Sequence, residues 1–415
     1  MRKLLVLVGV LAVAAVVTLP AQQPAAVKAF TGMRLIDGTD RAPIDNATIL
    51  VRDGRIAAAG PAASVTIPAG AERVSLAGKH VIPGLVNAHG HANSLERDLD
   101  TYAKYGVTTV VSLGNDANAP AALAARDAQA SPSLTRARIF TSGPVLNPST
   151  PDAARADVAK VAAMKVDNVK IRVDDNLGTT PKMAPEIYRA VIDEAHKRNL
   201  RVAVHLFYLS DAKSVLDAGA DFIAHSVRDL DVDNDLIAKL KARGVCMCPT
   251  LMREVSTYVY ESTPAFFSDP LFVKYSDAQW ISQRKDPAFQ AKTAKDPTGQ
   301  RYKVALEVAS RNTKKLSDAG VTIAMGTDTG PAGRFMGYFE LMELELMAKA
   351  GLTPKQVLQS ATRDAARCHK IDADLGTLEA KKWADFVVLN ADPLANISNT
   401  RQIADVYIAG NRVAR

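Results

Sequence analysis

The sequence predicts an α/β protein: a (β/α)8 barrel of the TIM type, joined to a small β-sandwich domain built from both chain ends. Apolar strands alternate with amphipathic helices over residues 81–366, whereas residues 27–80 and 367–415 contain β-like runs separated by turns. The 415 residues are enough for a barrel of about 250 residues and a small second domain. With 47% hydrophobic and 23% charged residues, the chain does not belong to the disordered class.

Residues 1–21 are predicted to be a secretory signal peptide. Arg2 and Lys3 precede an apolar run over residues 4–17. This run of about 14 residues is shorter than the roughly 20 that a membrane-spanning helix needs. We therefore expect a secreted protein, with the periplasm favoured as its compartment, and no membrane association once the signal is removed.

The barrel prediction depends on eight apolar runs after residue 84. They are LVNAHGH, GVTTVVSLG, ARIFTSG, VDNVKIRV, RVAVHLF, ADFIAHS, GVCMCPT and GVTIAMGTD. Amphipathic stretches such as residues 184–199 and 211–219 lie between them. Nearly continuous apolar strands that are separated by helices indicate a parallel sheet covered on both faces.

Charge and cysteine content exclude two further classes. The chain has 51 basic and 44 acidic residues, a net charge of +7, and no run of five or more Lys or Arg. This balance is typical of a mildly basic surface and not of a nucleic-acid-binding protein. Three cysteines cannot form a disulfide framework, and we predict that Cys246 and Cys248 are buried thiols rather than zinc ligands.

Four histidines lie at or just after the ends of predicted strands. They are His89, His91, His205 and His225. The catalytic groups of a barrel gather at the carboxyl ends of its strands, and an HxH pair on a strand points both imidazoles to one face. Asp328 ends the run IAMGTD in the same way. The pattern predicts a metal site, and we assign structural roles to the three other histidines.

Lys170 is unusual because it lies inside the apolar run VDNVKIRV. An unpaired ammonium in an apolar interior is costly. The side chain must therefore point outward, pair with an acid or lose its charge. Carbamylation by CO2 is one way to lose the charge, and it would create an anionic oxygen ligand able to bridge two cations.

Several longer motifs surround these residues. They are PGLVNAHGH, the strand that contains Lys170, HLFYLSDAKSVLDAGADFIAHS, DAGVTIAMGTDTG, ELELMAKAGLTPKQVLQSATRDAA and LGTLEAKKWADFVVLNADPL. Together they resemble the amidohydrolase superfamily, in the branch of imidazolonepropionase-like proteins and prolidase-like dipeptidases. The resemblance covers nearly all of the chain after residue 21.

The resemblance implies a site with two divalent metal ions, of which Zn2+ suits a site rich in histidine nitrogen and carboxylate oxygen. The implied ligands are His89, His91, Lys170, His205, His225 and Asp328. The first histidine pair would bind one ion with Asp328, and the second pair would bind the other. N6-carboxylated Lys170 would bridge the ions, a hydroxide would sit between them, and Asp328 would act as general base.

The activity that the resemblance implies is hydrolysis of an amide C–N bond, with a dipeptide or an N-acyl amino acid as the substrate. The alternatives are an imidazolonepropionase-like hydrolase of a cyclic amide and an inactive metal- or ligand-binding barrel. Expected export disfavours the first, and the complete ligand set disfavours the second. A substrate carboxylate would meet one of Arg172, Tyr208, Arg228 and Arg334 near the strand ends, and we select Tyr208 and Arg228.

One turn departs from the resemblance. In the segment EAKKW, Lys381 stands where family members usually carry glycine. The turn belongs to the predicted β domain, so we expect altered local geometry and no effect on the chemistry.

Residues 253–300 are predicted to be a long, loop-rich segment. Its aromatic residues include Tyr258, Tyr260, Phe266, Phe267, Phe272, Tyr275 and Trp280. An exposed run of large rings usually marks a contact surface. Three roles are open for the segment: a lid over the substrate, an interface in a homo-oligomer, and a peripheral helical insertion.

Overall fold

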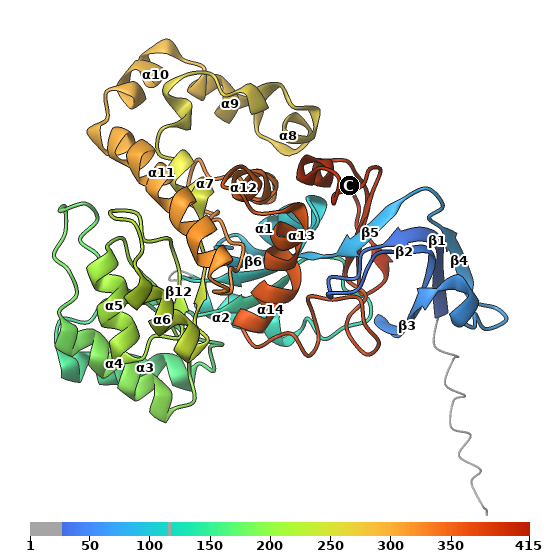
Figure 1. Cartoon of the computed structure of the whole chain (residues 1–415), viewed down its shortest axis with the longest axis horizontal. Coiled ribbons are helices and arrows are strands. Elements are labelled where there is room, and N and C mark those ends of the chain that lie inside the picture. The colour runs from blue at the N-terminus through green and yellow to red at the C-terminus, as the bar shows by residue number, and fades with distance from the viewer. Residues whose placement is uncertain (1–26, 115–117) are drawn as a thin grey trace, which may run out of the picture.

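The computed structural model describes residues 27–114 and 118–415, and the predicted signal peptide at residues 1–21 lies outside them. The chain has the α/β architecture that the sequence predicts (Figure 1). A mainly antiparallel sheet lies at one side of the molecule, and parallel strands surrounded by helices form the rest.

The two ends of the described chain share one eight-stranded sheet. Its strands are β1 (Val27–Leu35), β2 (Ile44–Arg52), β3 (Arg55–Pro61), β4 (Glu72–Ser75), β5 (His80–Pro83), β14 (Phe386–Leu389), β15 (Ile403–Ile408) and β16 (Asn411–Arg412). The strand order is β16-β15-β14-β5-β1-β2-β3, and β4 also pairs with β1. Strands distant in the sequence therefore become direct neighbours.

This sheet forks at β1. The first half of β1 pairs in parallel with β4, and its second half pairs in parallel with β5. The two arms of the fork enclose a core in which the ring centroid of Phe30 lies 4.9 Å from that of Phe386 and 4.8 Å from that of Tyr407. Burial of these aromatic side chains stabilises the contact between the two chain ends.

Eight shorter strands form two parallel sheets. One sheet contains β6 (Leu85–Gly90), β7 (Val107–Ser112) and β8 (Arg138–Thr141). The other has the order β13 (Cys246–Met247), β12 (Phe222–Ile223), β11 (Val202–His205), β10 (Val169–Arg172) and β9 (Val145–Leu146). Seven of these strands lie in seven of the eight apolar runs that the sequence analysis singled out.

The eighth run, at residues 320–328, forms isolated bridges instead of a regular strand. Ile323 bridges to Met247 of β13, and Thr329 bridges to Gly90 of β6, both in parallel. The backbone N–H of Ala88 also donates to the Met325 carbonyl at 2.9 Å. The segment therefore lies between the two parallel sheets and contacts both. Its pairing with β6 is irregular at Asp328, which has a positive φ of 58°.

Helices connect and cover the parallel strands. The longer ones are α1 (Leu95–Lys104), α2 (Ala119–Asp127), α3 (Pro151–Ala163), α4 (Pro185–Lys197), α5 (Leu209–Ala218), α6 (Asn234–Arg243), α11 (Pro297–Asp318) and α12 (Tyr338–Lys349). Each of them buries apolar side chains; α4, for example, buries Ile187, Val191 and Ala195 at a spacing of four residues. None of the described helices is both long enough and apolar enough to cross a membrane.

Residues 251–294 are mainly helical, so the expectation of a loop-rich segment is wrong. The segment contains α7 (Leu251–Val255), α8 (Pro270–Tyr275), α9 (Ala278–Arg284) and α10 (Pro287–Ala294) (Figure 1). Asp269 and Asp286 cap the N-termini of α8 and α10, and each is followed by a proline. Aspartate at the N-cap with proline after it is a helix-start signal, and it could have predicted these helices.

The aromatic residues of this segment are mostly buried, so the expected exposed run of rings is also wrong. Phe272 is 1% exposed, and its ring centroid lies 5.0 Å from those of Phe266 and of Tyr338 in α12. Tyr260 is 5% exposed. The rings pack against one another and against α12, as in the peripheral helical insertion that the sequence left open.

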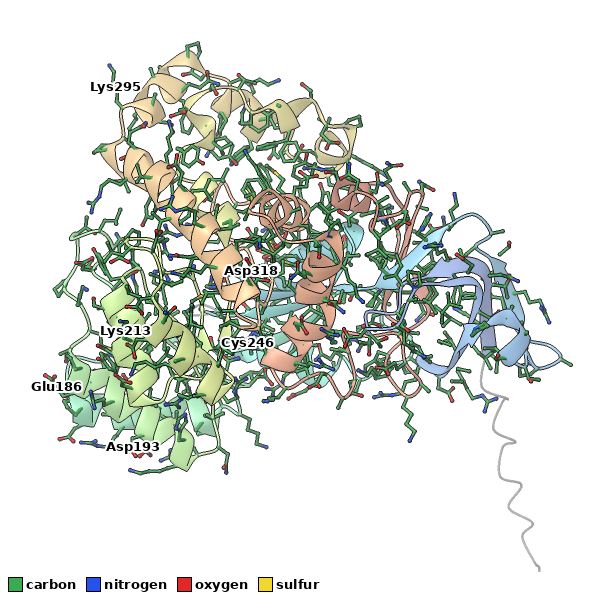
Figure 2. The ribbon with its side chains drawn as sticks, viewed as in Figure 1. Glu186, Asp193, Lys213, Cys246, Lys295 and Asp318 are labelled. Atoms are coloured by element: carbon green, nitrogen blue, oxygen red, sulfur yellow. A yellow bond between two sulfur atoms is a disulfide. The ribbon has the colours of Figure 1, made fainter. Side chains whose placement is uncertain are left out.

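Cys246 and Cys368 form a disulfide bond, which corrects the prediction of a thiol at Cys246 (Cys246 is labelled in Figure 2). The two cysteines are 122 residues apart in the sequence, but β13 and α14 (Ala365–Cys368) bring their Cα atoms to 6.0 Å. Cys248 is a buried thiol, as predicted.

Lys381 adopts a φ of 77° in the turn where glycine was expected. This is the left-handed conformation, which is less favourable for lysine than for glycine because lysine has a Cβ atom. Arg55 donates to the Lys381 carbonyl at 2.7 Å, and this contact helps to hold the turn.

A buried ion pair connects the parallel strands with the eight-stranded sheet. The guanidinium of Arg138, in β8, donates to both oxygens of Asp385 at 2.6 and 3.2 Å, and both side chains are at most 4% exposed. Asp385 also accepts from the backbone N–H of Ala409 at 2.7 Å. The pair thus joins three segments that are far apart in the sequence.

Replacement of Arg138 by Met should lower the free energy of unfolding by about 3–5 kcal/mol, because it leaves the Asp385 carboxylate buried without its cation. Arg311→Met is a matched control, since Arg311 and Asp231 form a pair in which both side chains are more than half exposed. That change should cost at most about 1 kcal/mol. Urea denaturation of both variants measures the difference, and equal losses would contradict a structural role for the buried pair.

Candidate metal centre

His89, His91 and Asp328 form the nucleus of the candidate site. His89 lies in β6 and His91 directly follows it. Asp328 Oδ1 lies 2.8 Å from His91 Nε2 and 3.5 Å from His89 Nε2. One ligand atom from each of the three residues lies within 4.8 Å of the others. The two histidines of the HxH motif and the aspartate of the GTD run therefore lie close together, as the sequence predicts.

Asp328 is held by its backbone and by a neighbouring arginine. Its backbone N–H donates to the His89 carbonyl at 2.6 Å, and its φ of 58° is unusual for a residue other than glycine. Asp328 Oδ2 accepts from Arg334 Nη1 at 2.5 Å. Burial alone would raise the pKa of the Asp328 carboxyl, but Arg334, His91 and His89 lower it well below its usual range. The carboxylate is therefore ionised, which is the form that binds a cation.

Lys170 points into the same space. It lies in β10 and is 3% exposed, and its Nζ atom is 3.3 Å from His89 Nε2. Burial lowers the pKa of its amine to about 8. Of the three possibilities that the sequence left for Lys170, the structure excludes an outward orientation.

His205 and His225 complete a row of imidazoles. Their ring centroids are 4.1 Å apart, and the His225 ring lies 4.7 Å from that of His89. Burial lowers the pKa of His205 to about 3 and that of His225 well below its usual value. Both rings are therefore neutral at ordinary pH, which is the form that binds metals.

The donor set fits a divalent metal ion. His225 Nδ1 hydrogen-bonds to Thr250 Oγ1 at 2.7 Å, whereas His225 Nε2 is buried and has no hydrogen-bond partner among the residues that the structure describes. A buried polar atom without a partner is costly. A cation would satisfy this nitrogen, and neutral imidazoles with a carboxylate are typical ligands of zinc and related ions.

The structure places the two selected substrate residues outside this row. The Arg228 side chain is fully buried, and its Nε atom lies 3.0 Å from Glu254 Oε1. Tyr208 is partly exposed, and its hydroxyl donates to Asp175 Oδ1 at 2.8 Å. Arg228 shares the Glu254 carboxylate with Arg253, whose Nη1 atom lies 3.0 Å from Glu254 Oε2, and Tyr208 is the more accessible of the two selected residues.

Asp174 was not found from the sequence. The Asp174 side chain is 2% exposed, with Oδ2 at 3.1 Å from His205 Nε2 and Oδ1 at 2.8 Å from Arg172 Nε. Its position, just after the strand that carries Lys170, was the available signal. Asp174 therefore contacts His205 of the second histidine pair from the carboxyl end of β10.

A buried carboxylate supports the first histidine pair from behind. Glu340 Oε1, in α12, accepts from Asn87 Nδ2, Thr327 Oγ1 and Thr329 Oγ1 at 2.6, 2.7 and 2.5 Å. Asn87 Oδ1 in turn accepts from the backbone N–H of His89 at 3.0 Å. Hydrogen bonds from residues behind the metal ligands orient those ligands. Through its hydrogen bonds, Glu340 connects α12 to both chain segments of the site.

A second glutamate of α12 holds the segment behind His225. Glu343 accepts from the backbone N–H groups of Leu251 and Met252 at 2.8 and 2.6 Å. The residue before them, Thr250, has a φ of 49°, which is strained for a β-branched side chain. Glu343 thereby fixes the turn from which the Thr250 hydroxyl reaches His225.

Replacement of Glu340 by Met should weaken zinc binding by about 10- to 100-fold, because three buried donors lose their acceptor and the His89 segment loses its support. Glu340→Gln is the matched control, since its amide oxygen can still accept from the same donors. Competition with a chelator measures the affinity of each variant. A Met variant that binds zinc as tightly as the Gln variant would contradict this supporting role.

Comparisons with known proteins agree with this geometry. The chain is 25% identical over 377 residues to imidazolonepropionase of Deinococcus radiodurans, covering 88% of this chain and 92% of that protein. The crystal structure of a putative prolidase from Bifidobacterium longum superposes with a TM-score of 0.76 at 26% identity, covering 95% and 96% of the two chains. A Xaa-Pro dipeptidase structure with bound methionine has a TM-score of 0.74 at 21% identity, covering 94% of this chain and all of that one.

These structural neighbours imply that the α/β fold is TIM-barrel-like. The model of the amidohydrolase family matches residues 80–413, which include every residue of the candidate metal centre. Members of this family depend on metals, and the His-His-Asp group has the composition that such a site requires. The chain belongs to the amidohydrolase family.

Proposed function

We propose that the protein is an exported, metal-dependent amidohydrolase that hydrolyses the amide C–N bond of a dipeptide or of an N-acyl amino acid. The observation that carries the proposal is the convergence of all six candidate ligands, with Lys170 Nζ only 3.3 Å from His89 Nε2. An inactive binding protein would have no need to retain the whole set. The prolidase-like structural relative supports a peptide-like substrate.

The proposed centre holds two divalent ions, with zinc as the expected metal. His89, His91 and Asp328 would bind one ion, His205 and His225 the second, and N6-carboxylated Lys170 both. Bound divalent ions lower the pKa of water and polarise a carbonyl group.

Asp328 is the proposed general base. Its carboxylate is ionised and can take a proton from the attacking water, then deliver it to the departing nitrogen. Its two oxygens are directed differently, Oδ1 toward His91 and Oδ2 toward Arg334. The imidazoles and Arg334 therefore fix the orientation of the carboxylate before a substrate arrives, which is the geometric requirement for proton transfer.

The proposed architecture around this centre is a closed (β/α)8 barrel over residues 81–366, with residues 27–80 and 367–415 as the β-sandwich domain. The position of residues 320–329 between β13 and β6 supports closure. The proposed partner is a small amide or peptide, and neither nucleic acid nor membrane is among the proposed partners.

A hydrolase of a cyclic amide is the second candidate, because imidazolonepropionase of Deinococcus radiodurans matches over most of this chain. The two candidates differ in the bond that is cleaved: an exocyclic amide or peptide bond in the first case, and a ring amide in the second. The substrate panel below separates them.

Zinc-loaded protein should contain two ions per chain and should hydrolyse members of a panel of Xaa-Pro and Xaa-Arg dipeptides and N-acyl-phenylalanine faster than imidazolonepropionate. Asp328→Asn should lower kcat at least about 100-fold, the usual effect of losing a general base, with a smaller change in KM. Elemental analysis and steady-state kinetics measure both. If the Asn variant retains zinc and its kcat is within a few fold of that of the parent protein, Asp328 is not the general base.

Export is supported by the Cys246–Cys368 disulfide, since such bonds persist in oxidising compartments. When the full chain is expressed in a bacterium with a periplasm, we expect periplasmic protein that lacks residues 1–21. Thiol titration under denaturing conditions should find one thiol, that of Cys248, and three after reduction. A chain that stays in the cytoplasm with an intact N-terminus would contradict export.

A further inference from the structure

Positive charge is concentrated in the helical segment around α10. Residues 270–303 contain seven basic and three acidic residues, against 51 and 44 in the whole chain. The three acidic side chains cap helices: Asp277, Asp286 and Asp296 accept from backbone N–H groups at 2.7, 2.9 and 2.8 Å. Carboxylates in this position stabilise the start of a helix. The segment therefore has more cations than carboxylates to pair with them.

Four cations in α9, in α10 or directly after these helices have no carboxylate within 4.0 Å in the part of the chain that the structure describes. They are Arg284, Lys285, Lys292 and Lys295. The Arg284 guanidinium lies 4.0 Å from the ring centroid of Trp280 and 5.1 Å from that of Phe289. Its Nη1 atom donates to the amide oxygen of Gln283 at 2.9 Å. The two rings thus hold the charge of Arg284 in place, and neither they nor the amide neutralises it.

An open pocket of about 920 Å³ lies beside these cations, and we call it the α10 pocket. Arg284, Lys292 and Lys295 line it, together with one carboxylate, that of Asp296. Helix α10 lies at the outer edge of the molecule (Figure 1), and Lys295 is labelled in Figure 2. A concave surface with an excess of one charge attracts ligands of the opposite charge. The α10 pocket therefore favours an anion.

One face of α10 and its C-terminal end form a wall of this pocket. Four lining residues are spaced as on one side of a helix: Ala288, Ala291, Lys292 and Lys295. None of the α10 side chains, all of which the structure describes, is fully buried. This face therefore does not pack against the core. The half-buried Phe289 and the buried Tyr260 also line the pocket, so apolar surface lies next to the cations.

We propose that the α10 pocket binds an organic anion with an extended apolar body, such as a medium-chain carboxylate. The apolar body lies along Ala288 and Ala291, and the carboxylate lies among Arg284, Lys292 and Lys295. Burial of the apolar body and the charge-assisted contacts both favour binding. None of the six candidate metal ligands lines the pocket, so the site is separate from the metal centre and independent of the proposed hydrolysis.

Octanoate and octan-1-ol are matched probes, because they share the alkyl chain and differ in charge. We expect calorimetry on zinc-loaded, full-length mature protein to show octanoate binding at least about tenfold more tightly at low salt, the scale of a charge-assisted hydrogen bond. Raising the NaCl concentration from about 0.05 to 0.5 M should weaken octanoate binding more than octanol binding, because salt screens exposed charges. Equal affinities for the two probes at low salt would overturn the proposal.

A double variant with Lys292→Gln and Lys295→Gln removes two charges from exposed positions. Its preference for octanoate over octan-1-ol should fall to within about threefold, since Arg284 alone remains. Lys241→Gln is the matched control, because Lys241 is an exposed lysine of α6 that also has no carboxylate within 4.0 Å among residues 27–114 and 118–415. A double variant with the same preference as this control would contradict the role of the lysines.

Ala288→Trp tests the apolar part of the site. The indole ring would occupy the space along α10, so octanoate affinity should fall at least about fivefold through loss of apolar contact. Ala294→Trp is its control, because Ala294 is also exposed on α10 but does not line the pocket. If both tryptophan variants bind octanoate as the parent does, the α10 pocket is not the binding site.

Removal of zinc with a chelator separates the α10 pocket from the metal centre, since a carboxylate also binds zinc directly. We expect octanoate affinity to be unchanged in the metal-free protein. Loss of binding together with the metal would overturn the proposal and place the carboxylate at the metal centre. Because these measurements need no turnover, they decide the proposal whether or not the protein hydrolyses any amide.

Discussion

The structure depends on the burial of four imidazoles and one amine beside two carboxylates, those of Asp328 and Asp174. His89, His225 and Lys170 are each at most 3% exposed, although nitrogen groups of this kind lose free energy when they leave water. Asp328 contacts His89 and His91, and His225 Nε2 has no hydrogen-bond partner in the described part of the chain. A protein pays such a cost where function requires it, and here a cation is the simplest group that would offset it.

Helix α12 is the element that makes this arrangement rigid. Glu340 accepts three hydrogen bonds, from Asn87, Thr327 and Thr329. Glu343 accepts two, from the backbone N–H groups of Leu251 and Met252. Burial raises the pKa of Glu343 to about 8, so its backbone hydrogen bonds oppose a strong desolvation penalty. Two strained backbone positions, at Thr250 and Asp328, lie next to these glutamates, and the hydrogen bonds stabilise them.

The periphery connects this centre to its surroundings in two ways. On one side, Arg138 and Asp385 attach the eight-stranded sheet to β8, and the Cys246–Cys368 disulfide attaches β13 to α14. On the other side, Phe266 and Phe272 of the helical segment at residues 251–294 pack against Tyr338 of α12. Both sets of contacts stabilise the scaffold around the candidate metal centre.

The sequence by itself determined the features that follow from local periodicity. Alternation along a strand placed His89 and His91 on one face, and the apolar run around Lys170 reduced the possibilities for its amine to an outward orientation, an acidic partner or loss of its charge. The helices of residues 251–294 could also have been predicted, because Asp269 and Asp286 each precede a proline. All of these signals lie within a few residues of the side chain concerned.

Tertiary structure alone decided the contacts that join distant segments. Nothing near Arg228 in the sequence indicates that it would pair with Glu254, and nothing near Cys246 indicates a bond to a cysteine 122 residues away. The support of Asn87 by Glu340 spans 253 residues in the same way. Pairings of this kind depend on how whole helices and strands pack, and the burial that makes them strong exists only after the chain has folded.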